Sequence, residues 1–288
     1  MTNEIDGLWP SRVAILGVGL LGGSVAMSIG RQRPETKFIG YARTPEKCSQ
    51  LADLHLLDEV TDSIPTLCRG CDVIVVAAPV DRIAELVIQV SKHAPTGALI
   101  TDVGSTKEGI VGQVSADSVA QSMFVAAHPI AGSEKSGARH AMAELFDRKT
   151  IVVTPTDQTD GDLLAKAEKF WGLTGGKTVR MSPAEHDAHL AAVSHVPHFV
   201  SALVAKMTMP GARPLVGSGW QDITRVAAGD PEMWTAICKE NRAAIGQEFV
   251  KLRDELDRLL QMIEAKDDES LRSWLAEAKR VKEQTSNS

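Results

Sequence analysis

The sequence predicts an α/β domain with a doubly wound parallel sheet, followed by an all-helical domain. In the first part of the chain, short apolar runs alternate with segments of helical periodicity, a pattern typical of buried parallel strands joined by crossover helices. Beyond Ser182 and Pro183 the strand pattern stops and only helical periodicity remains. We therefore expect a first domain over residues 11–181 and a helical second domain over residues 182–288.

The strands are expected at the apolar runs, and the helices between them. The expected strands are 13–16, 38–41, 73–76, 99–101, 124–126, 151–153 and 178–181. The segments 84–90 and 107–114 have the length and periodicity of crossover helices. All strands of this pattern are expected to be parallel.

Helix signals organise the second domain. Ser182, Pro183 and Glu185 supply an N-cap, a proline at the first helical position and a carboxylate at N3, which predicts a helix start. From Ala236 to about Arg280 we expect two amphipathic helices. One apolar stripe runs along them, formed by Ile245, Phe249, Leu252, Leu256 and Leu259.

Composition excludes several classes of function. The chain is 43% hydrophobic and 24% charged with a formal net charge of -6, and it has no basic run, so nucleic acid is not an expected partner. Its first ten residues contain Glu4 and Asp6 where a signal peptide needs positive charge and an apolar core. No stretch approaches the roughly 18 apolar residues of a membrane span. We expect a cytoplasmic protein without a membrane partner.

Cys68 and Cys71 have the spacing of a redox pair. They precede an expected strand, whereas an activated thiolate lies at the start of a helix, so two thiols packed beneath the sheet are favoured over a redox pair. Four cysteines in the whole chain are too few for a disulfide framework.

A glycine-rich turn lies between the first strand and the following helix. The pattern, in which the three glycines allow a tight turn, close approach of a pyrophosphate and close packing of helix on strand, predicts a Rossmann-type dinucleotide site; a glycine turn without a ligand is the alternative. The candidate cofactor-binding residues here are Gly17, Gly19, Leu20, Leu21 and Gly22.

The end of the second strand predicts which dinucleotide binds. No carboxylate stands where it would accept hydrogen bonds from a ribose 2′-hydroxyl; Ala42 is followed by Arg43 and Thr44, which could contact a 2′-phosphate. NADP is therefore favoured over NAD, the alternative being a solvated arginine. After the third strand, Ala78 and Pro79 let the backbone run close to a bound nicotinamide ribose.

Two polar residues follow later strands at the edge where ligands of open α/β sheets bind. Ser105 follows the strand at 99–101 and is a candidate catalytic residue, although it could also cap the helix that starts at Lys107. His128 follows the strand at 124–126. Its position favours proton transfer at neutral pH over a purely structural role.

The helical half adds further candidates. His195 and His198 flank Pro197, which is expected to break a helix; zinc is not expected, because no third ligand follows with suitable spacing. Arg225 could clamp a carboxylate of the substrate, or it could form a surface ion pair with a neighbouring aspartate.

Taken together, these motifs resemble the prephenate and arogenate dehydrogenase family of tyrosine biosynthesis. The resemblance covers almost the whole chain, and its most specific part is the ten-residue run that starts at His128. It rests on the glycine turn, on His128-Pro129-Ile130-Ala131-Gly132 with Glu134-Lys135-Ser136-Gly137, on Ser194-His195-Val196-Pro197-His198, and on Asp222-Ile223-Thr224-Arg225 with Asp230-Pro231 and Trp234.

The resemblance implies NAD(P)-dependent oxidative decarboxylation of prephenate to 4-hydroxyphenylpyruvate, or of arogenate to tyrosine, in a homodimer joined through the helical domains and without a metal. It implies that His128 hydrogen-bonds the ring hydroxyl and that Ser105 orients it. The implied substrate-binding residues are His195, Arg225, Ser133, Glu134, Asp222 and Trp234, of which Arg225 matches the partner of the ring carboxylate.

One departure and two alternatives stay open. Gln221 stands where some members of the family carry a lysine, so the choice between prephenate and arogenate is open. A hydroxyacid dehydrogenase or imine reductase shares the same order of domains but often uses a lysine in its helical half. A non-catalytic dinucleotide sensor would bind NAD or NADP without turning over a cyclohexadienol.

Overall fold

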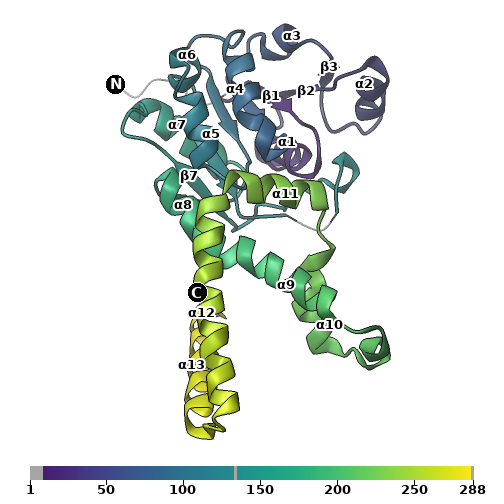
Figure 1. Cartoon of the computed structure of the whole chain (residues 1–288). Helices are drawn as coiled ribbons and strands as arrows, with labels where there is room; N and C mark the ends of the chain where they lie inside the picture. Colours follow the sequence, from purple (N-terminus) through teal and green to yellow (C-terminus); the bar gives the residue numbers. More distant parts are fainter. Residues whose placement is uncertain (1–8, 133–134, 287–288) are drawn as a thin grey trace. The chain divides into compact units, whose positions relative to one another are not determined.

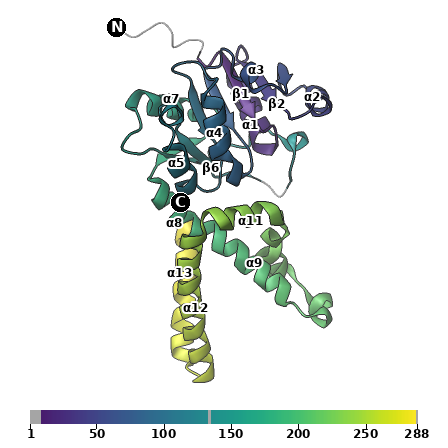
Figure 2. The same ribbon diagram turned by 45° about the horizontal axis from the view of Figure 1, so that its top comes forward.

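The computed structural model describes residues 9–132 and 135–286. Figure 1 and Figure 2 show the chain in two views. The chain forms two units, one that ends at Arg242 and one that begins at Ala243, and each is described by itself below.

The first unit is built on a five-stranded parallel sheet of order β3-β2-β1-β4-β5. The expected strands 13–16, 38–41, 73–76 and 99–101 are confirmed. Their bounds are β1 Arg12–Leu16, β2 Lys37–Tyr41, β4 Val73–Val76 and β5 Leu99–Asp102. The edge strand β3, Glu59–Thr61, was not predicted, because it is short and lacks an apolar run.

A second, three-stranded sheet has the order β6-β7-β8, with bounds Ala126–Pro129, Thr150–Thr154 and Lys177–Arg180. An isolated parallel bridge between Ile100 and Phe124 connects it to β5. The expectation that all strands are parallel is wrong here, since β6 and β7 are antiparallel. In the described part of the connection between them, the regular structure is a short 3-10 turn, Ala138–His140, whereas a crossover between parallel strands is usually an α-helix.

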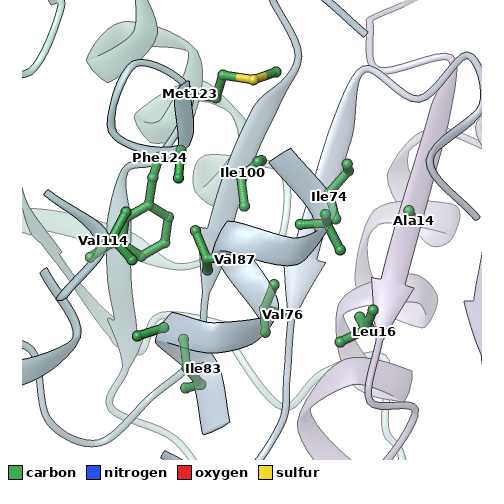
Figure 3. Close-up of a cluster of buried hydrophobic side chains, with 14 of the residues drawn as sticks. Ala14, Leu16, Ile74, Val76, Ile83, Val87, Ile100, Val114, Met123 and Phe124 are labelled. Atoms are coloured by element: carbon green, nitrogen blue, oxygen red, sulfur yellow. The ribbon is translucent and has the colours of Figure 1, made fainter. Parts of the chain in front are cut away.

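Helices cover both faces of the sheet, as the doubly wound prediction requires. The apolar side chains of β1 alternate between two buried clusters: Ala14 and Leu16 belong to one, Val13 and Ile15 to the other. Figure 3 shows the first cluster, in which residues of three strands meet Ile83 and Val87. The helices of this part are α1 Leu20–Gln32, α2 Pro45–Ala52, α3 Ile64–Cys68, α4 Ile83–Ser91, α5 Glu108–Val114, α6 Ser118–Gln121 and α7 Gly161–Gly172, with a 3-10 turn η2 at Val80–Arg82.

The two close cysteines belong to this core. Cys68 and Cys71 are free and buried in the first cluster. Burial raises the pKa of the Cys68 thiol to about 12 and that of Cys71 to about 11. Both stay protonated at neutral pH, so the interpretation as packed thiols is confirmed.

The helical segment starts as predicted. Ser182 and Glu185 form a capping box at the start of α8, Pro183–Leu190. The expectation that Pro197 breaks the helix is wrong: a π-helical turn, Ala191–His195, joins α8 directly to α9, Val196–Met207. Proline has no N–H to donate to the preceding turn, and the wider π turn accommodates this without ending the helix.

By length and composition alone, Pro183–Met207 could cross a membrane. This corrects the expectation that no stretch of the chain meets that criterion. The core helix of a globular domain passes the same test. Here the stretch carries His186, Asp187 and His195, whose side chains are buried within the first unit.

Short helices complete the first unit. They are η5 Pro210–Leu215, α10 Ser218–Thr224, η6 Arg225–Ala228 and α11 Pro231–Glu240. Ile237 of α11 is buried in the first cluster, and Trp234 and Ala236 pack against it. This contact places α11 next to η2, the turn that follows β4.

The second unit is a pair of helices, α12 Arg242–Glu264 and α13 Asp268–Ser286, which lie side by side in both views (Figure 1, Figure 2). The Trp274 indole N–H donates to Glu255 Oε1 at 2.6 Å across the pair. Two helices were expected from Ala236 to about Arg280; the pair is present, but it begins at Arg242, because Ala236 belongs to α11. Their apolar stripe is only partly covered in this chain, where Leu256 is 48% exposed.

Candidate functional site

The glycine turn has a backbone that only glycine adopts freely. Gly17 has a φ of 105°, and a Cβ at this position would collide with the carbonyl group of Ala77. A Cβ at Gly22 would collide with the carbonyl oxygen of Gly17, so the first turn of α1 packs tightly onto the loop. No atom of the described residues lies within 4 Å of the position that a Cβ would take at Gly19. This is the cradle shape that a pyrophosphate requires.

The N-terminus of α1 faces the same turn with the positive end of the helix dipole. The helix begins at Leu20 with Gly19 as N-cap, no side chain caps it, and its first turn contains no acidic residue. The first amides of a helix lack partners within the helix and carry its positive end. Leu20 and Leu21 anchor this turn by packing against the second buried cluster. The residues present therefore fit a dinucleotide phosphate.

The predicted selectivity residues follow β2. Ala42 is buried and its amide donates to the Thr61 carbonyl, whereas Arg43 is exposed. The Thr44 hydroxyl accepts from the Lys47 amide at 3.3 Å and so caps α2.

Two predicted residues follow neighbouring strands. Ala78 and Pro79 lie after β4, directly beside the glycine turn. Ser105 is half-buried after β5. The alternative that Ser105 caps the next helix is wrong, because both oxygens of Asp187 accept the first amides of α5, from Lys107 at 2.8 Å and from Glu108 at 2.9 Å.

His128 lies within β6, paired with Val152, and not after the strand as expected. Ala127, the residue before His128, is fixed to β5, because its amide donates to Asp102 Oδ1 at 3.0 Å. Asp102 also forms a fully buried ion pair with Lys107. Burial, with the nearby charges of His186, Lys107 and His195, lowers the pKa of His128 well below 6.5. His128 is therefore neutral at pH 7.

Two residues that were not predicted from the sequence hold the His128 ring. His128 Nδ1 is 2.8 Å from His186 Nε2, and His186 Nδ1 is 2.7 Å from Asp187 Oδ1. Both partners are buried in the first two turns of α8. The sequence does show two adjacent titratable residues, His186 and Asp187, just inside a well-capped helix. Nothing in the sequence indicates that they contact His128.

His195 lies near this group in the π turn. It is 1% exposed, and its Nδ1 is 3.1 Å from the Asn241 amide nitrogen, which also donates to the Asp187 carbonyl at 2.7 Å. Burial lowers the pKa of His195 to about 4. His195 thus joins the group formed by His128, His186 and Asp187.

Trp234, on α11, contacts two of the histidines of the helical segment. Its ring stacks on His198 with centroids 3.5 Å apart and an interplanar angle of 9°, and it meets His195 edge-on at 6.2 Å. Asp222 and Arg225 are both exposed, at α10 and at the start of η6. Ser133 and Glu134 lie outside the described residues.

Within residues 9–132 and 135–286, no three side chains of the metal-binding types are grouped to hold an ion. The polar groups instead form a buried cluster of histidine and carboxylate side chains on β6 and α8, and the turn after β1 fits a dinucleotide. This combination is that of a dinucleotide-dependent dehydrogenase.

Comparison with known proteins gives the family. Residues 25–180 match the family described as prephenate dehydrogenase, nucleotide-binding domain, and residues 182–277 match its dimerization domain. Bacillus subtilis prephenate dehydrogenase is 31% identical over 277 residues, which cover 93% of this chain and 74% of the relative.

Solved structures agree. A crystal structure of A. aeolicus prephenate dehydrogenase in complex with hydroxyphenyl propionate and NAD+ has a TM-score of 0.86 at 34% identity, covering 93% of this chain and 96% of that one. Synechocystis arogenate dehydrogenase has a TM-score of 0.79 at 27% identity, with 95% and 99% covered.

The chain belongs to the prephenate/arogenate dehydrogenase family, a family of cyclohexadienyl dehydrogenases in tyrosine biosynthesis. The resemblance inferred from the sequence is confirmed, and the chain is an enzyme with a nucleotide-binding and a dimerization domain. The alternatives of a hydroxyacid dehydrogenase, an imine reductase and a non-catalytic sensor are set aside.

Proposed function

We propose that this enzyme oxidatively decarboxylates prephenate or arogenate with His128 as the general base. The observation that carries the proposal is the state of His128: its ring is held by His186 at 2.8 Å, and burial keeps it neutral at pH 7. A neutral imidazole in a unit that binds a dinucleotide is suited to accept a hydroxyl proton.

One histidine can both accept and return the single proton that the reaction moves. The bound dinucleotide supplies the acceptor for the hydride from the carbon that bears the ring hydroxyl. His128 Nε2 accepts the hydroxyl proton, which relieves the positive charge that develops on that carbon. Loss of carbon dioxide then leaves an aromatic phenolate, and the same nitrogen returns the proton to its oxygen.

Other residues take roles by their match to the family. Arg225 pairs with the ring carboxylate, as its guanidinium is suited to a bidentate contact, and Ser105 orients His128 and the hydroxyl. His195 and Trp234 bind the substrate from the helical side. The match to the family assigns Ser133 and Glu134, outside the described residues, to the side chain of the substrate, and Asp222 to the site of the other subunit.

For the cofactor we propose NADP in preference to NAD. The A. aeolicus relative was solved with NAD+, so the preference rests on this chain alone. Ala42 presents no carboxylate to repel a 2′-phosphate, and the exposed Arg43 follows it. A charge-assisted hydrogen bond from Arg43 would favour the phosphorylated ribose.

The enzyme is further proposed to be a homodimer. The dimerization domain supports this, and so do the apolar side chains that α12 and α13 leave exposed in the single chain. Asp222 and Trp234 would then act near the subunit boundary.

A matrix of prephenate and arogenate against NAD and NADP tests the proposal. We expect reduced cofactor with at least one substrate, and a higher kcat/KM with NADP than with NAD. Arg43→Ala should lower kcat/KM for NADP but not for NAD. Arg69→Ala is the matched control, an exposed arginine in the turn after α3. Equal effects of Arg43→Ala on both cofactors would contradict the assigned role.

A further inference from the structure

A buried chain of hydrogen bonds connects His128 to a carboxylate on another element. It runs from His128 Nδ1 to His186 Nε2, 2.8 Å, and from His186 Nδ1 to Asp187 Oδ1, 2.7 Å. His186 is 0% exposed and Asp187 is 1% exposed. The first member lies on β6 and the other two on α8, so the chain crosses between two elements that are distant in sequence.

The proton positions in this chain follow from the carboxylate. Both oxygens of Asp187 accept backbone amides, one from Lys107 and one from Glu108. Oxygens that accept these hydrogen bonds also accept from His186, so the proton between the two residues sits on His186 Nδ1. Burial lowers the pKa of His186, so this ring is neutral and its Nε2 carries no proton.

The donor and acceptor roles at the next ring, His128, follow in the same way. A bare His186 Nε2 can only accept, so His128 Nδ1 must be the donor. A neutral His128 then has its proton on Nδ1 and a bare lone pair on Nε2. Free imidazole offers both tautomers, and the hydrogen-bond partner selects one of them.

We propose that His186 and Asp187 are positioning residues, which hold His128 as the tautomer protonated on Nδ1 and so keep Nε2 free to act as the base. The proposal deepens the function proposed above and rests on it. Neither residue needs to touch the substrate, because both act through the ring of His128.

The charges around this chain are balanced. Lys107 is paired with Asp102, and the carboxylate of Asp187 is held by backbone amides of α5. The groups near His128 are Lys107 and the rings of His186 and His195, while Asp102 and Asp187 act on His186. The positive charge of Lys107 opposes protonation of both rings, which maintains the neutral chain.

The first test reads the tautomer directly. In the free enzyme with 15N-labelled histidine, long-range proton–nitrogen correlation spectra distinguish a protonated ring nitrogen from a bare one. We expect His128, assigned by the loss of its signals in His128→Asn, to show a protonated Nδ1 and a bare Nε2. A protonated Nε2 on His128 would overturn the proposal, whatever the enzyme's activity.

The second test removes the acceptor. In His186→Leu the Nδ1 donor of His128 loses its partner, so we expect a mixture of tautomers and a fall in kcat of roughly tenfold or more, with the dissociation constant for NADP unchanged. His186→Gln keeps an acceptor oxygen near the same place and should recover most of the loss. His93→Gln, an exposed histidine after α4, is the matched control.

The outcomes separate the two proposals. An unchanged tautomer and kcat in folded His186→Leu would show that His186 is only structural. If His186→Leu does not fold, the wild-type tautomer and the His186→Gln variant still decide. A confirmed tautomer together with a normal kcat for His128→Asn would keep this inference about the ring and reject His128 as the base.

Discussion

At the residue scale, the environment of His128 sets its pH dependence. Because its pKa lies well below 6.5, the neutral base persists below that pH. We expect the acid limb of the kcat/KM profile, which reports groups of the free enzyme, to lie below pH 6.5, and kcat/KM to be flat from there to neutrality. A profile of kcat/KM against pH measures this.

The matched variant is His128→Asn, which keeps a hydrogen-bonding group but removes the titrating nitrogen. General-base catalysis contributes about 10² to 10⁴ in rate, so kcat should fall by that factor while cofactor affinity stays constant. The acid limb should vanish. Near-normal turnover, or an acid limb that survives the substitution, would move the base to His195 or His198.

Arg225 gives a second prediction at this scale. Arg225→Ala should raise KM for the substrate much more than it lowers kcat, since a carboxylate contact made in the ground state is uniform binding. The loss should be about 2 to 3 kcal/mol, the range for charge-assisted bonds. Steady-state kinetics with Arg213→Ala as control measures it. An unchanged KM in folded Arg225→Ala would place this residue outside the site.

Single residues were predictable where local chemistry decides them. The glycines of the nucleotide turn, the capping box of α8 and His128 could all be found from short patterns. His186 and Asp187 could not, because their partners are 58 and 80 residues away in sequence. Side-chain pairing over such separations depends on tertiary packing, which no local pattern encodes.

At the scale of elements, the turn from β1 into α1 is the most constrained. Gly17→Ala would place a Cβ against the Ala77 carbonyl at a φ of 105°, so the loop must shift. We expect a destabilisation of about 1 to 3 kcal/mol and much weaker binding of NADP. Thermal unfolding and a fluorescence titration measure the two effects.

Gly112→Ala is the control for this substitution. Gly112 lies inside α5, and nothing in the described chain lies within 4 Å of the Cβ that it would gain. Alanine favours a helix by roughly 1 kcal/mol over glycine, so this variant should be as stable as the wild type or slightly more stable. Equal losses in both variants would contradict the account of the turn.

The type of each element was easier to predict than its pairing. The apolar runs gave the buried strands, and periodicity gave the helices. The direction of β6 relative to β7 was missed because it depends on the irregular connection between them. Likewise the effect of Pro197 depended on a π turn, an outcome that the proline pattern alone does not contain.

At the scale of the whole molecule, buried histidines make stability depend on pH. Burial lowers the folded-state pKa of His195 from 6.5 to about 4, and it lowers that of His128 and His186 as well. Protonation therefore favours the unfolded chain: the contribution is complete above pH 6.5 and is lost as the pH falls towards 4. For His195 alone the shift corresponds to roughly 3 kcal/mol.

Thermal melts between pH 7.5 and about 4.5 test this. The melting temperature should fall with pH, and His195→Asn should show a shallower fall while its Tm at pH 7.5 is lower. A Tm that is constant over this range would contradict the burial of neutral histidines.

The oligomeric state is a further prediction for the whole molecule. Exposed apolar side chains on α12 and α13, among them Leu256 and Leu260, favour association. We expect sedimentation to show a dimer at micromolar concentration. Leu256→Glu should shift it towards monomer, while Gln261→Glu, which adds the same charge at an exposed position, should not. A wild-type monomer would remove the basis for Asp222 acting across subunits.

The Asp187 carboxylate, described above as a helix cap, also sets which parts of the enzyme move as one body. It binds two amides at the start of α5 and the ring of His186, and its carbonyl oxygen accepts from Asn241 at the end of α11. Hydrogen bonds to a charged group contribute about 1.5 to 3 kcal/mol each, so separating α8 from the sheet would cost several times the thermal energy. The body that carries His128 therefore extends through Asp187, past the end of the strand pattern, and through Asn241 to the end of α11.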